Sequence, residues 1–177
     1  MAVKKISEIG SNPIRSKAKK LSNIQGVQTK KLIKDLKDTM RHNNLVGIAA
    51  PQIGESLRIF VTEIRETKYR KKMKTDSFRV FVNPRIVSHS KRMVSSYEGC
   101  GSVASTNIFG PVKRYLSVII RAQNQRGESF EYKASGFLAR VIQHELDHLN
   151  GIVFIDKVTN SKQLLGKEEY INIVGGD

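Results

Sequence analysis

The stretch Gln143-His144-Glu145-Leu146-Asp147-His148 has the pattern H-E-x-x-H, and we take it to be the centre of the fold. On a helix, residues four apart lie on one face, so His144 and His148 can bind the same metal ion. Glu145 lies beside them, where it can accept a proton from a water molecule on that metal. The alternative is a surface helix with two unrelated histidines, but the chain has only 4 histidines and this pattern contains two of them. The stretch therefore predicts a helix that carries a metal site.

The residues around this stretch support a helix. Ser135 is a suitable N-cap, and Gly151 is a suitable residue to end the helix. Arg140 and Asp147 on the same helix either support the metal ligands or are ordinary helix charges, and we favour a structural role. Apolar residues recur at the spacing of a buried helical face: Phe137, Leu138, Val141, Ile142, Leu146 and Leu149.

A catalytic metal usually has three protein ligands and one open position, so the two histidines need a third ligand. Acids such as Asp156 and Glu168 lie beyond a predicted strand or in a polar tail, and no histidine follows His148. Cys100 is the only cysteine, and it lies between two glycines whose backbone can fold closely around an ion. A lone cysteine is often a small buried apolar residue, but flanking glycines are not typical of a packed core strand. Cys100 is therefore predicted to be the third ligand.

The composition is that of an ordinary soluble protein. The chain of 177 residues is expected to form one domain, residues 1–177, and 39% of its residues are hydrophobic. Neither a membrane-spanning run nor a signal peptide is recognisable. A single cysteine excludes an internal disulfide, so we expect a cytoplasmic protein.

The net charge is the unusual feature of the composition. A formal charge of +15 and a pI of about 10.1 favour contact with polyanions. The densest basic run is Tyr69-Arg70-Lys71-Lys72-Met73-Lys74, which we expect in an exposed hairpin loop. No aromatic array or nucleic-acid motif accompanies it, so the charge indicates proximity to ribosomes or RNA without sequence recognition. The alternative is that the lysines reflect background composition and solubility.

The chain predicts an α+β fold of mostly antiparallel strands packed around a central metal-binding helix, with an N-terminal helix. The N-terminal helix is predicted at residues 27–42, where an apolar stripe runs among lysines and aspartates. Residues 45–54 are rich in small side chains and form either a packed strand-to-turn segment or a wall facing a substrate. His89 is expected in a loop and not as a ligand. The remaining predictions are a helical turn at residues 12–15, strands at 57–64, 78–82, 116–122, 130–133 and 152–155, a turn at 124–127 and a short final element at 168–174.

Three segments of the chain together resemble peptide deformylase. The pattern G-x-G-x-A-A-P-Q is matched by Leu45–Gln52, E-G-C-x-S by Glu98–Ser102 and Q-H-E-x-D-H by Gln143–His148. The similarity extends from the first residues to Asp156 and covers nearly the whole chain. One such motif is weak, but three motifs in the same order are highly specific.

The resemblance implies a single divalent metal ion bound by Cys100, His144 and His148. In the family this ion is most often Fe²⁺, and Zn²⁺, Ni²⁺ or Co²⁺ can replace it. The family removes the formyl group from the N-terminal formyl-methionine of newly made polypeptides, which would be the partners of a monomeric enzyme here. The resemblance also implies that Arg114 pairs with Glu98 near the site.

The same resemblance implies the catalytic and substrate-binding residues. Glu145 is expected to be the general base and then the general acid. Gln52 is expected to hold the oxyanion, together with the backbone N–H of Gly101. The substrate peptide is expected to pair with the protein backbone as an added strand, at Val46, Gly47 and Gly99.

Three positions depart from the family pattern. Leu45 replaces the first glycine of the first motif, Gly101 replaces a residue that is commonly leucine, and Ala104 replaces a frequent proline. Leu45 is expected to crowd the peptide groove, and Gly101 lacks a side chain that would wall the methionine pocket. Two alternatives follow: a divergent metallohydrolase with altered acyl or peptide specificity, and a ribosome- or RNA-binding paralogue with weak activity. The intact metal ligands argue against the second, because a protein that only binds has no need of them.

Overall fold

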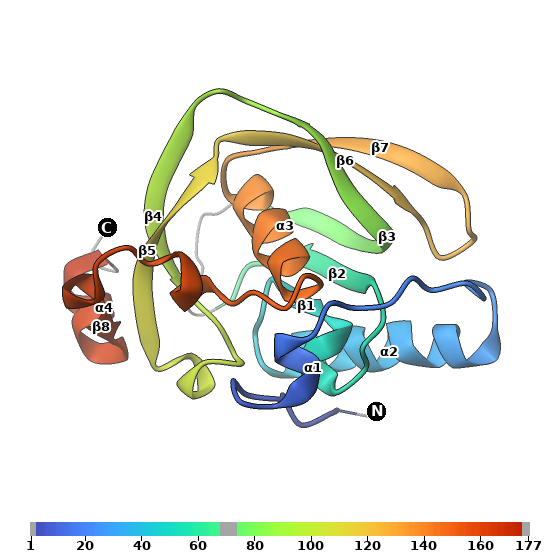
Figure 1. Cartoon of the computed structure of the whole chain (residues 1–177), viewed down its shortest axis with the longest axis horizontal. Coiled ribbons are helices and arrows are strands. Elements are labelled where there is room, and N and C mark those ends of the chain that lie inside the picture. The colour runs from blue at the N-terminus through green and yellow to red at the C-terminus, as the bar shows by residue number, and fades with distance from the viewer. Residues whose placement is uncertain (1–2, 68–73, 175–177) are drawn as a thin grey trace.

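The computed structural model describes residues 3–67 and 74–174, and it has the predicted α+β fold (Figure 1). Figure 1 shows helix α3 in the middle of the molecule, with long strands curving around it. The helices of the described chain are α1 (Asn12–Arg15), α2 (Val27–His42), α3 (Gly136–His148) and α4 (Lys167–Val174). None of them is long and apolar enough to cross a membrane.

The strands of the described chain form two antiparallel sheets. The larger has the order β1-β2-β3-β6-β7, from β1 (Gly47–Ala49), β2 (Ile59–Ile64), β3 (Asp76–His89), β6 (Ser117–Gln123) and β7 (Ser129–Ser135). The smaller has the order β4-β5-β8, from β4 (Met93–Gly99), β5 (Ile108–Tyr115) and β8 (Leu165–Gly166). Two strands that matter for the site, β1 and β4, are therefore each at the edge of a sheet.

Helix α3 is held in place by its apolar face. Ala139 and Ile142 are fully buried in the same core cluster as Phe60 and Phe81 of the larger sheet. The Phe60 and Phe81 rings are stacked with their centroids 4.7 Å apart. Full burial of side chains of this size stabilises a fold by about 1.5–3 kcal/mol each, so the helix has a fixed position against the sheet.

Two further clusters complete the core. The apolar stripe of α2 packs against β1 and β2 through Leu36 and Met40, which are fully buried. Cys100 belongs to a third cluster with Ile14 and Phe154, at the base of the smaller sheet. The predicted helix at residues 27–42 and the turn at 12–15 both match the observed bounds.

The strand predicted at residues 152–155 is wrong. Phe154–Lys157 (η3) is a 3-10 turn, and Val153 precedes it with an extended backbone. Its Asp156 carboxylate accepts a 2.9 Å hydrogen bond from Val153 N–H and another from the Arg15 side chain. Local hydrogen bonding by an aspartate competes with strand pairing, which explains why the apolar run turns.

The predicted strand at 78–82 lies in the first half of the longer β3, which continues through Pro84 with register shifts against β6. His89 ends β3 instead of lying in a loop, and its ring stacks on Tyr115 with centroids 3.6 Å apart. Residues 69–73 of the basic run lie outside the described residues, and Lys74 is exposed.

Candidate metal centre

The structure brings the three predicted metal ligands together. Cys100 directly follows β4, and His144 and His148 lie on successive turns of α3. Their ligand atoms all lie within 4.8 Å of one another, and Cys100 Sγ is 3.2 Å from His148 Nε2. All three side chains are buried or nearly so. One soft thiolate and two imidazoles suit a tetrahedral divalent ion with one open position, so these residues fit the implied metal.

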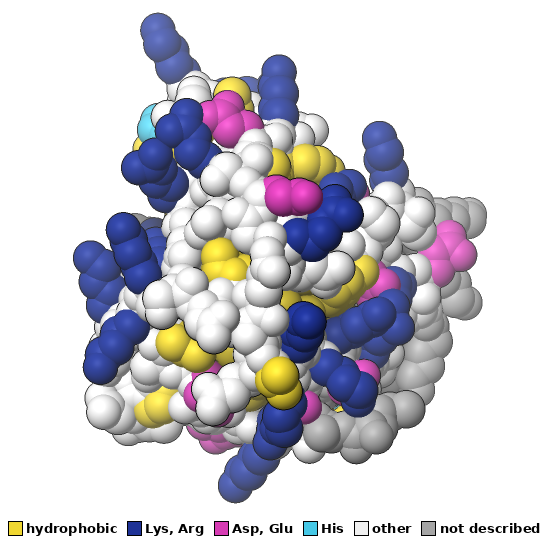
Figure 2. Space-filling view, turned by 90° about the vertical axis from the view of Figure 1, so that its right-hand side faces the viewer, with side chains coloured by type: hydrophobic (Ala, Val, Ile, Leu, Met, Phe, Trp, Pro, Cys, Tyr) yellow, Lys and Arg dark blue, Asp and Glu magenta, His cyan; other side chains and the backbone are white. Residues whose placement is uncertain are grey.

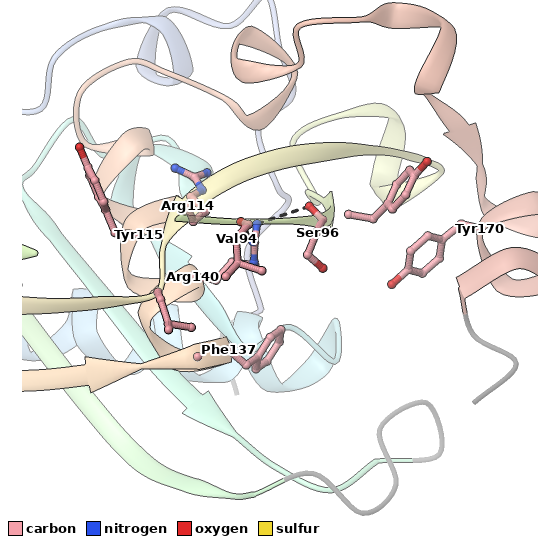
Figure 3. A pocket seen from close by; sticks show the side chains of 10 residues that line it. Val94, Ser96, Arg114, Tyr115, Phe137, Arg140 and Tyr170 are labelled. Carbon is pink, nitrogen blue, oxygen red and sulfur yellow. Dashed lines mark hydrogen bonds between the residues drawn. The ribbon is translucent and has the colours of Figure 1, made fainter. Parts of the chain in front are cut away.

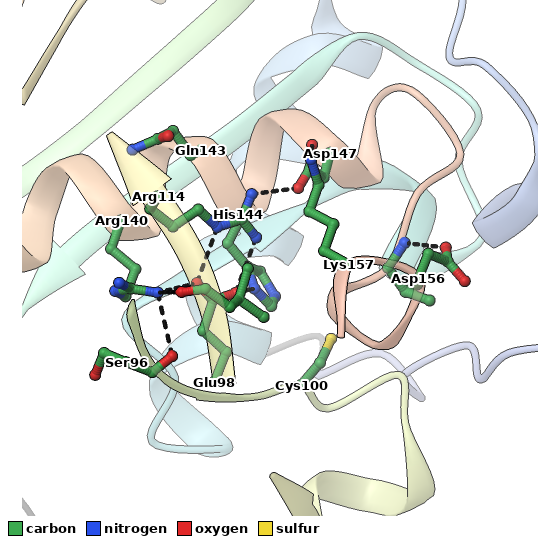
Figure 4. Close-up of polar contacts among 12 residues, drawn as sticks. Ser96, Glu98, Cys100, Arg114, Arg140, Gln143, His144, Asp147, Asp156 and Lys157 are labelled. Atoms are coloured by element: carbon green, nitrogen blue, oxygen red, sulfur yellow. Dashed lines mark hydrogen bonds and ion pairs between the residues drawn. The ribbon is translucent and has the colours of Figure 1, made fainter. Parts of the chain in front are cut away.

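Glu98 fixes the orientation of the His144 ring (Figure 4). Its Oε2 lies 2.9 Å from His144 Nδ1, which leaves the other ring nitrogen for the metal. Arg114 binds the same carboxylate through both oxygens, each at 2.9 Å, as the resemblance implied. Burial opposes ionisation of Glu98, but the hydrogen bonds from Arg114 and His144 outweigh burial and hold the pKa of Glu98 well below its usual range. Glu98 is therefore an anion that carries the imidazole of His144.

Two further charges of α3 belong to the same network. Arg140 donates to Glu98 Oε1 at 2.7 Å and to the backbone oxygens of Val94 and Val112, so it ties α3 to β4 and β5. Asp147 accepts from the Arg114 guanidinium. The expected structural roles of Arg140 and Asp147 thus extend to the residues that support the metal ligands.

The electrostatics of the centre favour a thiolate. Burial penalises the Cys100 thiolate, but the charges and hydrogen bonds of His148 and His144 prevail and lower the pKa of Cys100 well below its usual range. A thiolate is the form of cysteine that binds metals, so the lowered pKa of Cys100 favours the form that could hold an ion.

Glu145 is buried and has an unsatisfied oxygen. Only 3% of its surface is exposed, and no partner within the described residues bonds its Oε2. Burial raises its pKa, the neighbouring histidines oppose that change, and the resulting pKa is about 7. A Cβ atom on Gly47 would lie 2.6 Å from Oε1 of Glu145, so β1 reaches the carboxylate without any side chain between them. An orphaned carboxylate with this pKa is suited to exchange a proton with a water molecule.

Gln52 presents its amide nitrogen to the centre. Its Oε1 accepts a 2.8 Å hydrogen bond from Ala49 N–H, which sets the orientation of the amide. Its Nε2 lies 3.6 Å from Cys100 Sγ and 3.4 Å from Ser102 Oγ. Gly101 is buried beside Cys100, and its N–H makes no hydrogen bond within the described part of the chain. Gln52 Nε2 therefore lies next to Cys100, and the unbonded N–H of Gly101 belongs to the next residue of the chain.

The two edge strands flank the centre with free backbone groups. Val46 C=O accepts from Glu63 N–H at 2.9 Å, so in the antiparallel alternation Gly47 directs its N–H and C=O away from β2. The N–H of Val46 makes no hydrogen bond within residues 3–67 and 74–174. Gly99 ends β4, whose other edge pairs with no described strand. An extended peptide can add to these edges.

A hollow of about 310 Å³ lies beside the ion-pair network (Figure 3). Arg140 lines it and lies one helical turn, about 5.4 Å, before the ligand His144 on α3. Most of its other walls are apolar or aromatic, namely Val94, Tyr97, Tyr115, Leu116, Phe137 and Tyr170. Such walls suit an unbranched, polarisable side chain.

A cysteine and two helical histidines that could hold one ion, beside a buried glutamate whose Oε2 has no partner among the described residues, are typical of a metallohydrolase. The sequence matches the family model described as Polypeptide deformylase over residues 3–164. The chain belongs to the polypeptide deformylase family, whose members are hydrolases.

Individual relatives agree with this assignment. The peptide deformylase of Dictyoglomus turgidum is 40% identical over 162 residues, which cover 92% of this chain and 97% of the relative. The structure of a class I type b peptide deformylase from Acinetobacter baumannii bound to Met-Ala-Ser has a TM-score of 0.83 and 32% identity, covering 89% of this chain and 100% of that chain. The peptide deformylase of Thermotoga maritima has a TM-score of 0.79 and 32% identity, covering 90% and 100%.

Proposed function

We propose that this protein removes the N-formyl group from the formyl-methionine of newly made polypeptides. The observation that carries the proposal is the buried group of Cys100, His144 and His148 beside the unpartnered Glu145 carboxylate, between two open strand edges. The Acinetobacter baumannii relative binds Met-Ala-Ser, which has the form of a deformylated product. We expect the enzyme to act as a monomer in the cytoplasm.

Each residue of the site has a role in this reaction. When bound, the ion polarises the formyl oxygen and makes a water molecule more acidic. Glu145, with a pKa of about 7, accepts a proton from the attacking water and later returns it to the leaving amine. Gln52 Nε2 and the N–H of Gly101 donate hydrogen bonds to the oxygen on which negative charge develops.

The substrate is held by backbone and by the hollow beside Arg140. The N–H of Val46, the outward backbone of Gly47 and the end of β4 at Gly99 pair with the extended peptide. The methionine side chain enters the hollow lined by Phe137 and Arg140, of which Arg140 lies one helical turn before His144. A formyl carbon bears only hydrogen, so a confined centre selects it over larger acyl groups.

The resident metal is proposed to be Fe²⁺, with Zn²⁺, Ni²⁺ or Co²⁺ as substitutes. A thiolate with two imidazoles accepts any of these ions, so the donor set supports the group of metals. Metal analysis of protein purified without oxygen tests this directly. One iron per chain is the expected result, and stoichiometric zinc from iron-replete cells would contradict it.

The activity is tested by comparing formyl-Met-Ala-Ser with acetyl-Met-Ala-Ser on the metal-loaded protein. Rapid release of formate, with no release of acetate, is the expected result. Cleavage of both acyl groups would instead support a metallohydrolase with altered acyl specificity, which the departures Leu45 and Gly101 favour as the second candidate. Cleavage of neither would reject the proposed function.

Ribosomal RNA is the proposed polyanionic partner of the basic surface. Figure 2 shows one face of the molecule, on which Lys and Arg side chains project at the top, the left and the bottom and acidic side chains are fewer. With a net charge of +15, binding to ribosomes should weaken steeply as salt rises. Changing Arg70, Lys71, Lys72 and Lys74 to Ser should reduce cosedimentation with ribosomes at low salt and leave turnover of a short peptide unchanged. Salt-insensitive binding would contradict an electrostatic contact.

A further inference from the structure

The chain before α1 lies against both segments that carry the proposed oxyanion donors. Ser7 N–H donates to the backbone oxygen of Gln52 at 2.8 Å, and Ile9 N–H donates to the backbone oxygen of Ser102 at 2.9 Å. Gln52 belongs to the 3-10 turn η1 (Ala50–Ile53), whereas Ser102 follows the metal ligand Cys100 in the other motif. Residues 4–9, here called the N-terminal arm, therefore join two segments that are far apart in the sequence.

Two further contacts hold the arm, one before these bonds and one between them. Lys4 N–H donates to Thr39 Oγ1 of α2 at 3.0 Å, before the first bond. Glu8 accepts from Ser105 Oγ at 2.8 Å, in the loop that continues from Cys100. Movement of either oxyanion segment away from the other would therefore break backbone bonds to an arm that cannot follow both.

The side chain of Ile6 lies over Gly101. A Cβ atom on Gly101 would be 3.1 Å from Ile6 Cδ1, 3.6 Å from Ile6 Cγ2 and 3.8 Å from Leu45 Cδ1. The first distance is tighter than ordinary van der Waals contact, so a side chain at position 101 needs the space that Ile6 takes. Two of the departures from the family pattern, Leu45 and Gly101, thus meet at one point with Ile6.

We propose that the N-terminal arm is a clamp that sets the distance between the oxyanion donors of Gln52 and Gly101, with Ile6 as its positioning residue. Gly101 has a flexible backbone, and the packing of Ile6 and Leu45 replaces the restraint that a side chain would give. The inference rests on the proposed function, since it assigns a role in stabilising the charge that develops during deformylation. It also predicts a physical coupling between Ile6 and Gly101 that exists whatever the substrate is.

The test is a double-mutant cycle with Ile6→Ala, Gly101→Leu and the double variant, each loaded with metal and assayed with formyl-Met-Ala-Ser. Ile6→Ala should lower kcat about tenfold with little change in KM, because an oxyanion donor acts only in the transition state. Gly101→Leu should lose more, and adding Ile6→Ala should restore much of that loss. Ile9→Ala is the matched control, because Ile9 is 40% exposed and keeps its N–H in the variant; its kcat should equal that of the unaltered protein.

Amide hydrogen exchange of Gly101 and Ser102 gives a second measurement that needs no activity. Ile6→Ala should speed exchange at both amides, Ile6→Val should not, and metal content should stay at one ion per chain. Equal kcat in Ile6→Ala and Ile9→Ala, or a double variant no better than Gly101→Leu, would overturn the proposal. If the unaltered protein released no formate, the proposed function would fail, while unchanged exchange in Ile6→Ala would separately reject the clamp.

Discussion

Adding one methyl group at Gly47 should disable the enzyme and leave its fold intact. The new Cβ would lie 2.6 Å from Oε1 of Glu145 and 2.9 Å from its Cδ and Cγ atoms. Ordinary contact begins at 3.4 Å, so the carboxylate has to move by about 0.8 Å. A misplacement of about 1 Å in a catalytic group can cost about 10²-fold in rate, or about 2.7 kcal/mol of barrier.

Stability should respond much less than activity. The three nearest atoms all belong to the flexible side chain of Glu145, which can turn aside without any shift of backbone. Alanine also loses less conformational entropy than glycine in a strand, by roughly 0.5–1 kcal/mol. We therefore expect the free energy of unfolding of Gly47→Ala to stay within about 1 kcal/mol of the unaltered value.

The assay is steady-state release of formate, with metal content and urea unfolding measured on the same preparations. KM should change little, because alanine keeps the N–H and C=O that face the peptide. Gly166→Ala in β8 is the matched control, since a Cβ there meets nothing within 4 Å. A Gly47→Ala protein that holds its metal and keeps its full kcat would refute the role given to Glu145 or the packing that places it.

Four further changes test other parts of the site. Cys100→Ser should lose most of its bound metal, because a soft thiolate becomes a poor ligand; full occupancy by metal analysis would sink the assignment. Glu145→Gln should keep its metal and lose at least ~10²-fold in kcat, measured as formate release. Phe137→Ala should raise KM for a formyl-methionyl peptide more than it lowers kcat, and an unchanged KM would place the methionine side chain elsewhere. Glu63→Gln should cost about 1 kcal/mol at pH 7, measured by urea unfolding, because the hydrogen bond from Arg41 lowers the pKa of Glu63 from 4.5. Because the pKa of Glu63 is lowered in the folded protein, its contribution to the free energy of unfolding is fully present above pH 4.5 and is lost as the pH falls through the folded pKa. The difference in stability between Glu63→Gln and the unaltered protein should therefore shrink at acid pH. An equal difference at pH 7 and at acid pH would contradict this reasoning.

The grouping of Cys100, His144 and His148 was predictable because it depends on local geometry and on the scarcity of cysteine and histidine in the chain. The helical spacing of His144 and His148 places both on one face whatever surrounds the helix. The chain has one cysteine, so few candidates remained for the third ligand. The strand predicted at residues 152–155 failed because the Asp156 carboxylate bonds the nearby N–H of Val153 and is also held by Arg15 from far along the chain.

The glycines show the limit of motif reasoning. Gly47 was expected to matter through backbone pairing with the peptide, but the structure adds that no side chain fits between its Cα and Glu145. Gly101 was expected to lack a side chain that would wall the methionine pocket, and the structure adds that the side chain of Ile6 lies over this glycine. Nothing in the sequence near either glycine reports these neighbours, because both contacts join segments distant in the chain.

For Glu98, in contrast, the sequence does indicate its place beside Cys100 and His144. In an extended strand, residues two apart point to the same face, so Glu98 at the end of β4 lies on the side of Cys100. A carboxylate there needs cationic partners if it is buried, and His144 Nδ1 needs an acceptor if its other nitrogen binds metal. Arg140 lies one helical turn before His144, on the same face of α3, and can therefore reach the same carboxylate. All of these groups find their partners if Glu98 lies between α3 and β5. The bonds of Glu98 to His144, Arg140 and Arg114 show this arrangement. The carboxylate that orients His144 is thus also the one that docks α3 on the smaller sheet through Arg140 and Arg114, so we expect substitution of Glu98 to disturb both the candidate metal centre and the packing of α3.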